Sequence, residues 1–302
     1  MLKDRVRTQW FRSQIEGNPE EFRGKVVMDV GSGTGVLAMF AAKAGARKVY
    51  AVEGSSIANL AKELVKSNGL EEVVTVIHRR VEDLGVEEIE KVDIIISEFM
   101  GFYLLHESML DSVIAARDKF LKPGGLMLPS VARIYSAPVS LPSMWKENVE
   151  IWIDVDQTYG LDLSGVVEPT LKTLTLSPKV DECVPQEGLG SEPQLVWEAD
   201  LTTVEAKALE TVDRRMTFPV TPKALLHGLC VWFDVQGIGK TSGTLLSTSP
   251  WSEPTHWKQT VVIFGRQLQM SEGQPVLGCH LVFGKTEKPR QYMIGLELFD
   301  PS

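Results

Sequence analysis

The stretch VVMDVGSGTG, residues 26–35, places an apolar strand directly before three closely spaced glycines. Gly31, Gly33 and Gly35 stand where this strand ends and where helical composition begins, from Gly35 to Ala44. Glycine lets the backbone come close to a ligand, and the amino end of a helix favours polar or anionic groups. The stretch therefore predicts a ligand site at a strand–loop–helix junction.

The next predicted strand, over 48–53, ends at Glu53, where a carboxylate can accept both hydrogens of a ribose diol. The glycines are spaced GxGxG rather than GxGxxG, because Val36 stands where a dinucleotide fold would carry glycine. This loop behind Asp29 looks like that of the S-adenosylmethionine methyltransferases. We favour that cofactor over a dinucleotide and over a purely structural turn.

Further strands are predicted over 73–80 and 92–97, and helices over 55–68 and 108–121, before the stop signal KPGG. Short apolar strands that alternate with helices indicate a parallel sheet covered on both faces. In HRRVED, Val81 offers an apolar surface for an adenine ring and Glu82 an acceptor for its amine. We expect both to complete the nucleoside site.

After about residue 129 the alternation of strand and helix patterns gives way to strand patterns separated by turns. We therefore expect one domain over 1–129 and another over 130–302. Strand-like segments such as LLHGLCVWFDVQ and YMIGLELF, separated by Gly, Pro and Ser turns, indicate an antiparallel barrel or sandwich. Within it, Trp145, Trp152 and Tyr159 recur about every seven residues, which fits internal packing or a partner surface. Residues 169–193 read as loop-rich.

The composition excludes several classes of protein. A net charge of −9 and a pI near 5.2 argue against nucleic-acid binding and suit a basic partner. No apolar run reaches the roughly 18 residues of a membrane helix, and the first residues lack a secretory signal. The three cysteines and five histidines show no disulfide or metal spacing, so we expect reduced thiols, no metal, and a cytoplasmic or nuclear location.

The segment SEFMGFYLLHES, residues 97–108, sets Glu98 and Glu107 on either side of an apolar, aromatic loop. This segment resembles the double-glutamate loop of the protein arginine N-methyltransferases. MLKDRVRT (1–8) is similar to their amino-terminal motif, DVGSGTG (29–35) to their cofactor loop, and STSP with PTHWKQT (247–260) to their Thr-His-Trp loop. The four motifs occur in the family's order.

The resemblance implies a Rossmann-like S-adenosylmethionine methyltransferase domain, then a β-barrel with an inserted dimerisation arm at about 141–165. It implies transfer of methyl groups to arginine in Arg-Gly-rich proteins or histones, by a homodimer. The loop is similar to that of type I enzymes, which give monomethyl and asymmetric dimethyl arginine. A catalytically impaired partner subunit is the alternative reading. A helix that family members carry upstream of the MLKD motif is not in this sequence, so the resemblance does not extend to cofactor affinity or to lid closure.

The chemistry of the two glutamates agrees with this resemblance. A guanidinium is planar and always charged, and a carboxylate can fork onto it through two hydrogen bonds. We expect Glu98 and Glu107 to be buried and to meet their counter-charge in the substrate. By resemblance, Met100, Met109 and Trp257 border the same pocket, and the two methionines limit the room around the reacting nitrogen.

The resemblance also assigns roles in the first and last motifs. His256 pairs with Asp4, and the pair either accepts the released proton or locks the two domains together; we favour proton acceptance. Arg7 binds the methionine carboxylate of the cofactor.

Overall fold

Five short strands pair into one parallel sheet in the order β3-β2-β1-β4-β5. They are β1 (Val26–Val30), β2 (Lys48–Glu53), β3 (Val74–His78), β4 (Val92–Ile96) and β5 (Leu121–Leu128). Every residue of β1 is buried, which explains why its sequence is apolar without alternation. The computed structural model describes residues 2–273, 275–288 and 290–301.

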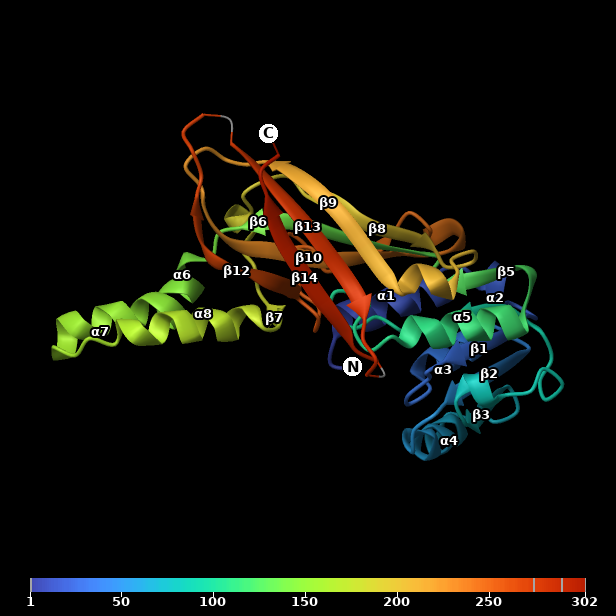
Figure 1. The fold of residues 1–302 in the computed structure, drawn as a ribbon. Coiled ribbons are helices and arrows are strands. Elements are labelled where there is room, and N and C mark those ends of the chain that lie inside the picture. The colour runs from blue at the N-terminus through green and yellow to red at the C-terminus, as the bar shows by residue number, and fades with distance from the viewer. Residues whose placement is uncertain (1, 274, 289, 302) are drawn as a thin grey trace.

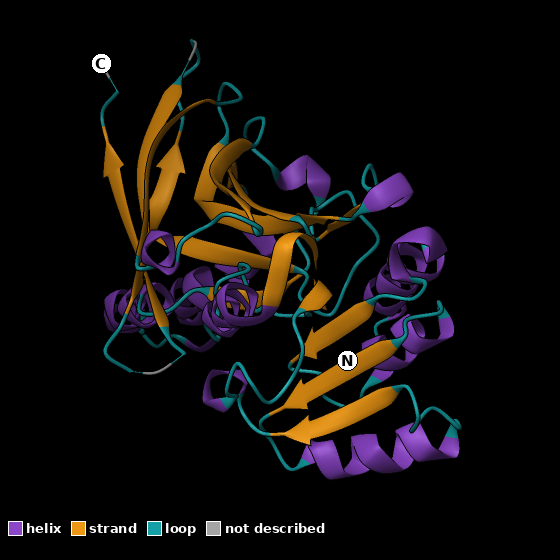
Figure 2. Cartoon of the chain, turned by 90° about the vertical axis from the view of Figure 1, so that its right-hand side faces the viewer, coloured by secondary structure: helices purple, strands orange, loops and turns teal. Residues whose placement is uncertain are grey.

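Helices cover both faces of this sheet, as predicted (Figure 2). They are α1 (Arg5–Glu16), α2 (Pro19–Phe22), α3 (Val36–Lys43), α4 (Ile57–Ser67) and α5 (Met109–Phe120). The connections through α3 and α4 run one way along the sheet and the connection through α5 runs the other way. Because such crossovers are right-handed, α5 lies on the opposite face.

The strand order reverses between β1 and β4, which are neighbours. Their carboxyl ends lead into the glycine loop and into the segment of Glu98, so two motifs far apart in the sequence meet at one edge. This is the position where open α/β sheets bind ligands.

The helix α1 joins the two halves of the chain through a buried polar network. Gln14 and Asn18 are both fully buried. The Gln14 amide donates to Thr244 Oγ1 at 2.5 Å and accepts from the N–H of Ile238 at 3.1 Å. Asn18 Oδ1 accepts from the N–H of Lys240 at 2.8 Å. Buried polar groups that are satisfied in this way fix one arrangement of the packed elements.

The second half of the chain forms antiparallel sheets. One has the order β7-β12-β10-β6-β8 with β11 paired to β10, and the other has the order β14-β13-β9. The strands are β6 (Val131–Val139), β7 (Lys179–Glu182), β8 (Gln194–Asp200), β9 (Thr211–Pro219), β10 (Leu225–Gln236), β11 (Leu245–Ser247), β12 (Gln259–Gln269), β13 (Val276–Lys285) and β14 (Tyr292–Phe299).

The expected antiparallel domain is therefore present, but its described strands do not close into a single barrel. The chain leaves β8 through turns that include the short helix η5 (Ala206–Leu209). As a result β9 pairs with β13 and forms no ladder with β8.

Helices between β6 and β7 project away from the sheets (Figure 1). We call residues 142–175 the arm; it contains α6 (Pro142–Trp145), the π-helix η2 (Lys146–Glu150), α7 (Ile151–Tyr159), η3 (Ser164–Val166) and α8 (Val167–Thr175). The loop-rich interpretation of 169–193 is wrong at its start, because α8 continues to Thr175. Its amphipathic surface packs on β12 and η2, and Pro169 is tolerated because it lies in the first turn of the helix, where its missing N–H costs no hydrogen bond.

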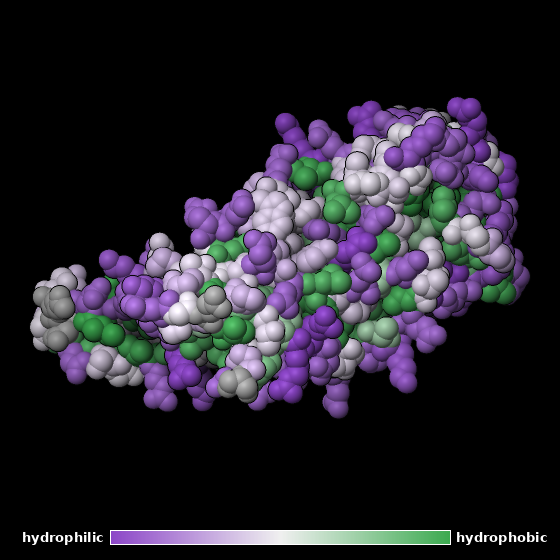
Figure 3. Space-filling model, turned by 90° about the horizontal axis from the view of Figure 1, so that it is seen from above, coloured by the Kyte–Doolittle hydropathy of each residue, from purple (hydrophilic) through white to green (hydrophobic). Residues whose placement is uncertain are grey.

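The arm's aromatic residues do not share one environment. Trp145 is 5% exposed and its ring lies 5.3 Å from that of His227, so it anchors the base of the arm within the chain. The interpretation of Trp145 as a partner surface is therefore wrong. Trp152 is half-buried and Tyr159 is 73% exposed. Figure 3 shows hydrophobic side chains along the surface of the projecting arm.

Candidate active site

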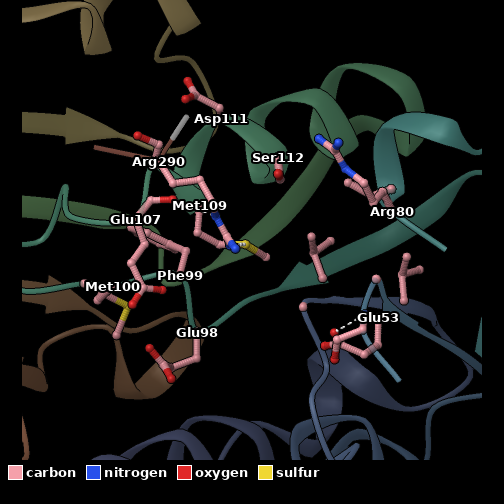
Figure 4. Close-up of a pocket in the computed structure, with 18 of the residues that line it drawn as sticks. Glu53, Arg80, Glu98, Phe99, Met100, Glu107, Met109, Asp111, Ser112 and Arg290 are labelled. Carbon is pink, nitrogen blue, oxygen red and sulfur yellow. Dashed lines mark hydrogen bonds between the residues drawn. The ribbon is translucent and has the colours of Figure 1, made fainter. Parts of the chain in front are cut away.

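A cavity of about 840 Å³ opens at the carboxyl ends of the parallel strands, next to the point where the strand order reverses. The parallel sheet and its loops supply one side, and the second half of the chain supplies part of the other (Figure 4). Its lining includes most of the residues that the sequence singled out: Gly31, Glu53, Val81, Glu82, Glu98, Met100, Glu107, Met109, His256 and Trp257.

The glycine loop and Glu53 form the cofactor side of the cavity. Gly31 and Gly33 have φ of +71° and +54°, which only glycine adopts readily. The Glu53 carboxylate accepts from the N–H groups of Gly33 and Ser55, each at 2.8 Å, which fixes its orientation and leaves lone pairs for a diol. A Cβ on Gly33 would meet nothing within 4 Å. The open backbone and the oriented acceptor fit an adenosine-type cofactor.

Val81 and Glu82 lie on the wall of this side. Val81 is 4% exposed. Glu82 accepts a hydrogen bond from Ser112 Oγ at 2.5 Å. Burial would raise the pKa of Glu82, but this bond and the nearby Arg80 guanidinium outweigh it and keep the pKa below its ordinary value. An ionised carboxylate here remains able to accept from an adenine amine.

Asp29 lies beneath the loop rather than in the cavity lining. It is 1% exposed, and its Oδ2 accepts from the N–H of Ala38 in the first turn of α3 at 3.0 Å. Burial raises the pKa of Asp29 to about 7. The residue therefore fixes the strand–helix junction that carries the glycines.

Glu98 follows β4, and its side chain is 6% exposed. Its Oε2 pairs with Arg7 Nη1 at 2.5 Å. Burial raises the pKa of Glu98 to about 7, although the Arg7 guanidinium opposes the shift; the charge of Glu107 adds to it. The acid is therefore costly to ionise here and is stabilised by a guanidinium.

Glu107 differs from Glu98 because it is exposed, so the expectation that both acids are buried is wrong. The chain makes a left-handed turn here, with φ of +74° at Glu107 and +50° at Ser108. Non-glycine residues hold such conformations only when their surroundings fix them. Here Tyr103 OH bonds to His106 Nδ1 at 3.0 Å within the same loop.

The predicted pocket residues lie between the two sides. Met100 is 5% exposed, and its carbonyl accepts from Trp257 Nε1 at 3.0 Å, which ties the Thr-His-Trp loop to the double-glutamate loop. The Met109 methyl lies 2.4 Å from the position of a Cβ built on Gly31. Met109 therefore contacts the cofactor loop directly and can limit the space next to it.

Asp4 and His256 are in contact, as the resemblance implied. The His256 ring Nδ1 lies 2.6 Å from Asp4 Oδ2, and the Asp4 Oδ1 caps α1 by accepting from the N–H of Arg7 at 2.9 Å. Burial would raise the pKa of Asp4, but the N–H groups of His256 and Arg7 outweigh it and lower that pKa. Arg7 is buried beside Glu98, and Asp4 stays ionised beneath the histidine.

Sequence reasoning missed Arg290, which comes from the loop between β13 and β14. Its Nε donates to the carbonyl of Glu107 at 3.1 Å, 183 positions away. No motif or spacing marks this arginine in the sequence, and only the fold brings it to the cavity.

Among the residues that the structure describes, no group of three or more His, Cys, Asp or Glu side chains is arranged to hold a metal ion. Nor is any described helix long and apolar enough to cross a membrane.

Comparison with known proteins agrees with this site. A family model described as the arginine methyltransferase oligomerization subdomain matches residues 130–299, and one described as a methyltransferase domain matches 27–125. The chain belongs to the protein arginine N-methyltransferase family. It transfers methyl groups from S-adenosylmethionine to arginine in proteins.

Relatives of this methyltransferase align over nearly its whole length. A probable protein arginine N-methyltransferase 6 of Arabidopsis thaliana is 39% identical over 98% of this chain and 75% of the relative. Protein arginine N-methyltransferase 6 of Danio rerio is 41% identical over 98% of this chain and 84% of its own. The solved PRMT1 enzyme–prozyme heterotetrameric complex of Trypanosoma brucei, with AdoHcy, superposes with a TM-score of 0.84, at 34% identity over 99% of this chain and 91% of that one.

Proposed function

We propose that this methyltransferase is a type I enzyme, giving monomethyl and asymmetric dimethyl arginine. The observation that carries the proposal is the juxtaposition of Glu98 and Glu107 with Met100 and Met109 in one cavity that continues to the glycine loop. The carboxylates supply the charge for a guanidinium, and the methionines bound the space for methyl groups.

When bound, the cofactor supplies a methyl group on a sulfonium centre. The buried Glu98 and the exposed Glu107 accept hydrogen bonds from the substrate guanidinium and fix its position and plane. Donation to both acids draws positive charge away from the remaining nitrogen, which makes it a better nucleophile. Positioning and electrostatics thus account for the acceleration. His256, held by Asp4, accepts the released proton.

The substrates follow from charge. The chain carries a net charge of −9, and two carboxylates line the acceptor side of the cavity: Glu98, which pairs with Arg7, and the exposed Glu107. This negative charge favours a cationic substrate. Arg-Gly-rich proteins and histones are the expected classes, because both present arginines in flexible, basic segments.

The arm is the proposed dimer contact between two copies of this chain. It carries exposed apolar residues that a free surface would not favour: Ile151, Ile153, Tyr159, Leu161 and Val166. The oligomerization subdomain matched over 130–299 includes the arm, and burial of these side chains against a second copy would stabilise a homodimer.

The test is mass spectrometry of an arginine–glycine-rich peptide incubated with the enzyme and S-adenosylmethionine. The lysine-substituted peptide and the Glu98→Gln enzyme are the controls. We expect mass gain on the arginine peptide alone, lost in the variant, with fragment ions that place both methyls on one nitrogen. Methyls on two different nitrogens, or a product that stops at one methyl, would contradict the type I proposal. No transfer while calorimetry detects cofactor binding would favour a partner subunit.

A further inference from the structure

The loop between β13 and β14 reaches the acceptor side of the cavity from the second half of the chain. Its Arg290 has φ of +65°, a left-handed conformation that arginine rarely adopts. Besides its Nε bond to the Glu107 carbonyl, its Nη2 contacts the Met109 Sδ at 3.7 Å. One guanidinium therefore contacts two of the residues that border the acceptor space, Glu107 and Met109 (Figure 4).

The same hairpin meets the double-glutamate loop and α5 at two more places. The ring of Tyr103 stacks on that of Phe283 in β13, with centroids 5.6 Å apart and an interplanar angle of 30°. The Lys285 Nζ lies 2.8 Å from Asp111 Oδ1 in α5. Segment 103–111 is thus fastened to the three-stranded sheet at several points along its length.

We propose that Arg290 is a positioning residue for methyl transfer, because it holds the turn that presents Glu107 and the thioether of Met109. This inference rests on the acceptor role proposed above for Glu98 and Glu107. The left-handed turn at Glu107 needs external support, and Arg290 supplies it from another domain. A misplacement of a reacting group by about 1 Å can lower a rate about 100-fold. Arg290 can therefore affect the rate through its hydrogen bond to the Glu107 backbone, although it does not contact the substrate.

The test compares three variants of the full chain. Arg290→Met keeps an unbranched side chain that reaches about as far as the arginine Nε and removes all its donors, whereas Arg290→Lys keeps one charged donor. Arg266→Met is the matched control, because Arg266 is an exposed arginine on β12 of the same half. We expect Arg290→Met to lower kcat about tenfold with an unchanged Kd for S-adenosylhomocysteine, Arg290→Lys to recover part of the rate, and the control to match the wild type.

Hydrogen exchange gives a readout that does not depend on turnover. The N–H groups of His106 and Ser108 form hydrogen bonds within the loop. Without the contacts of the Arg290 guanidinium, hydrogen exchange over residues 102–108 should be faster in Arg290→Met and unchanged in Arg266→Met. Unchanged exchange, or a kcat equal to that of the control, would overturn the inference. A loss of cofactor affinity in Arg290→Met would also overturn it, since the residue would then act on the other side of the cavity. If the wild type methylates no arginine peptide, the proposed function fails. The exchange comparison would still show whether Arg290 holds the turn at Glu107.

Discussion

The Asp4 carboxylate accepts two hydrogen bonds from His256, one from the backbone N–H at 2.8 Å and one from the ring Nδ1 at 2.6 Å. The residues are 252 positions apart, so this contact joins the start of α1 to the loop before β12. Because an ionised carboxylate only accepts, Nδ1 carries the proton and Nε2 of the neutral ring is left as an acceptor. The geometry thus suits both a proton acceptor and a link between domains.

We expect His256→Gln to lower kcat by about 100-fold, because general-base catalysis typically contributes that much or more. His280→Gln is a matched control, since His280 makes a similar bond to Asp213 at 2.8 Å outside the cavity lining. Peptide methylation rates and urea unfolding of both variants would be measured. If both variants keep the wild-type kcat, the Asp4–His256 pair is only a structural lock.

The pH dependence should report Glu98. Burial raises its pKa to about 7, and only the ionised form attracts a guanidinium, whose own charge does not change in this range. At saturating cofactor, kcat/KM for an arginine peptide should therefore rise with pH through about 7 and fall at lower pH. Initial rates across this range provide the measurement, and a flat profile would rule out control by Glu98.

Asp29 should make the fold less stable as the pH rises. Its folded pKa of about 7 lies above its ordinary 3.8, so the unfolded chain releases a proton that the folded chain keeps. Stability is lost between about pH 4 and pH 7. Asp29→Asn lacks this loss, because an amide does not titrate in this range, and its oxygen can still accept from the N–H of Ala38. Urea unfolding at about pH 4 and pH 7 measures the free energy of unfolding of both proteins. Relative to the wild type, the variant should become more stable as the pH rises. If the free energy of unfolding changes equally with pH in both proteins, the prediction is wrong.

Alanine substitutions at Gly31 and Gly33 distinguish the effect of backbone strain from the effect of crowding by a side chain. Alanine at Gly31 or Gly33 has to adopt a positive φ, which costs on the order of 1 kcal/mol. At Gly31, however, the new Cβ would lie 2.4 Å from the Met109 methyl, whereas at Gly33 it meets nothing within 4 Å. Gly31→Ala should push Met109 toward the acceptor and lower the fraction of dimethyl product, measured by mass spectrometry. Gly33→Ala should leave the product ratio unchanged, and the same ratio in both variants would exclude crowding by Met109.

A charge on the arm should prevent the proposed dimer from forming without unfolding the chain. Ile153 is 52% exposed, so Ile153→Asp removes apolar contact area and costs little within one copy. Val86, 59% exposed and outside the arm, offers Val86→Asp as the control. Sedimentation velocity should detect monomers only for Ile153→Asp, with both melting temperatures close to the wild type. A dimer that persists in Ile153→Asp would place the contact elsewhere.

Sequence reasoning was most successful where an apolar run has clear ends or where a motif is local. The strands predicted over 48–53 and within LLHGLCVWFDVQ coincide with β2 and β10, because their apolar runs end at charged or turn-forming residues. Glu53 could be assigned beside the glycine loop from spacing alone, since one strand and one helix fix the distance between them.

Features that depend on contacts across domains could not be read from the sequence. Whether a carboxylate is buried is set by what packs around it, so the difference between Glu98 and Glu107 emerged only in the fold. Arg290 carries no local signal, and its place is fixed by the pairing of β13 with β14 and β9. For the same reason, the sequence does not indicate that β8 and β9 fail to pair. The miss of α8 has a different cause, because Pro169 favoured a loop in the sequence analysis.

The polar network of α1 has a consequence for the order in which the chain folds during its synthesis. Gln14 and Asn18 emerge from the ribosome early, but their partners lie at residues 238–244. At about 5–20 residues per second, roughly ten seconds or more pass before those partners are made. Until then these two side-chain amides, which are fully buried in the finished protein, lack the partners that they have in the fold. The link from this end of α1 to the second half of the chain therefore forms last, although α1 is made first. A nascent chain that ends before residue 238 would lack these bonds, and α1 would be held only by its contacts with earlier elements such as α3.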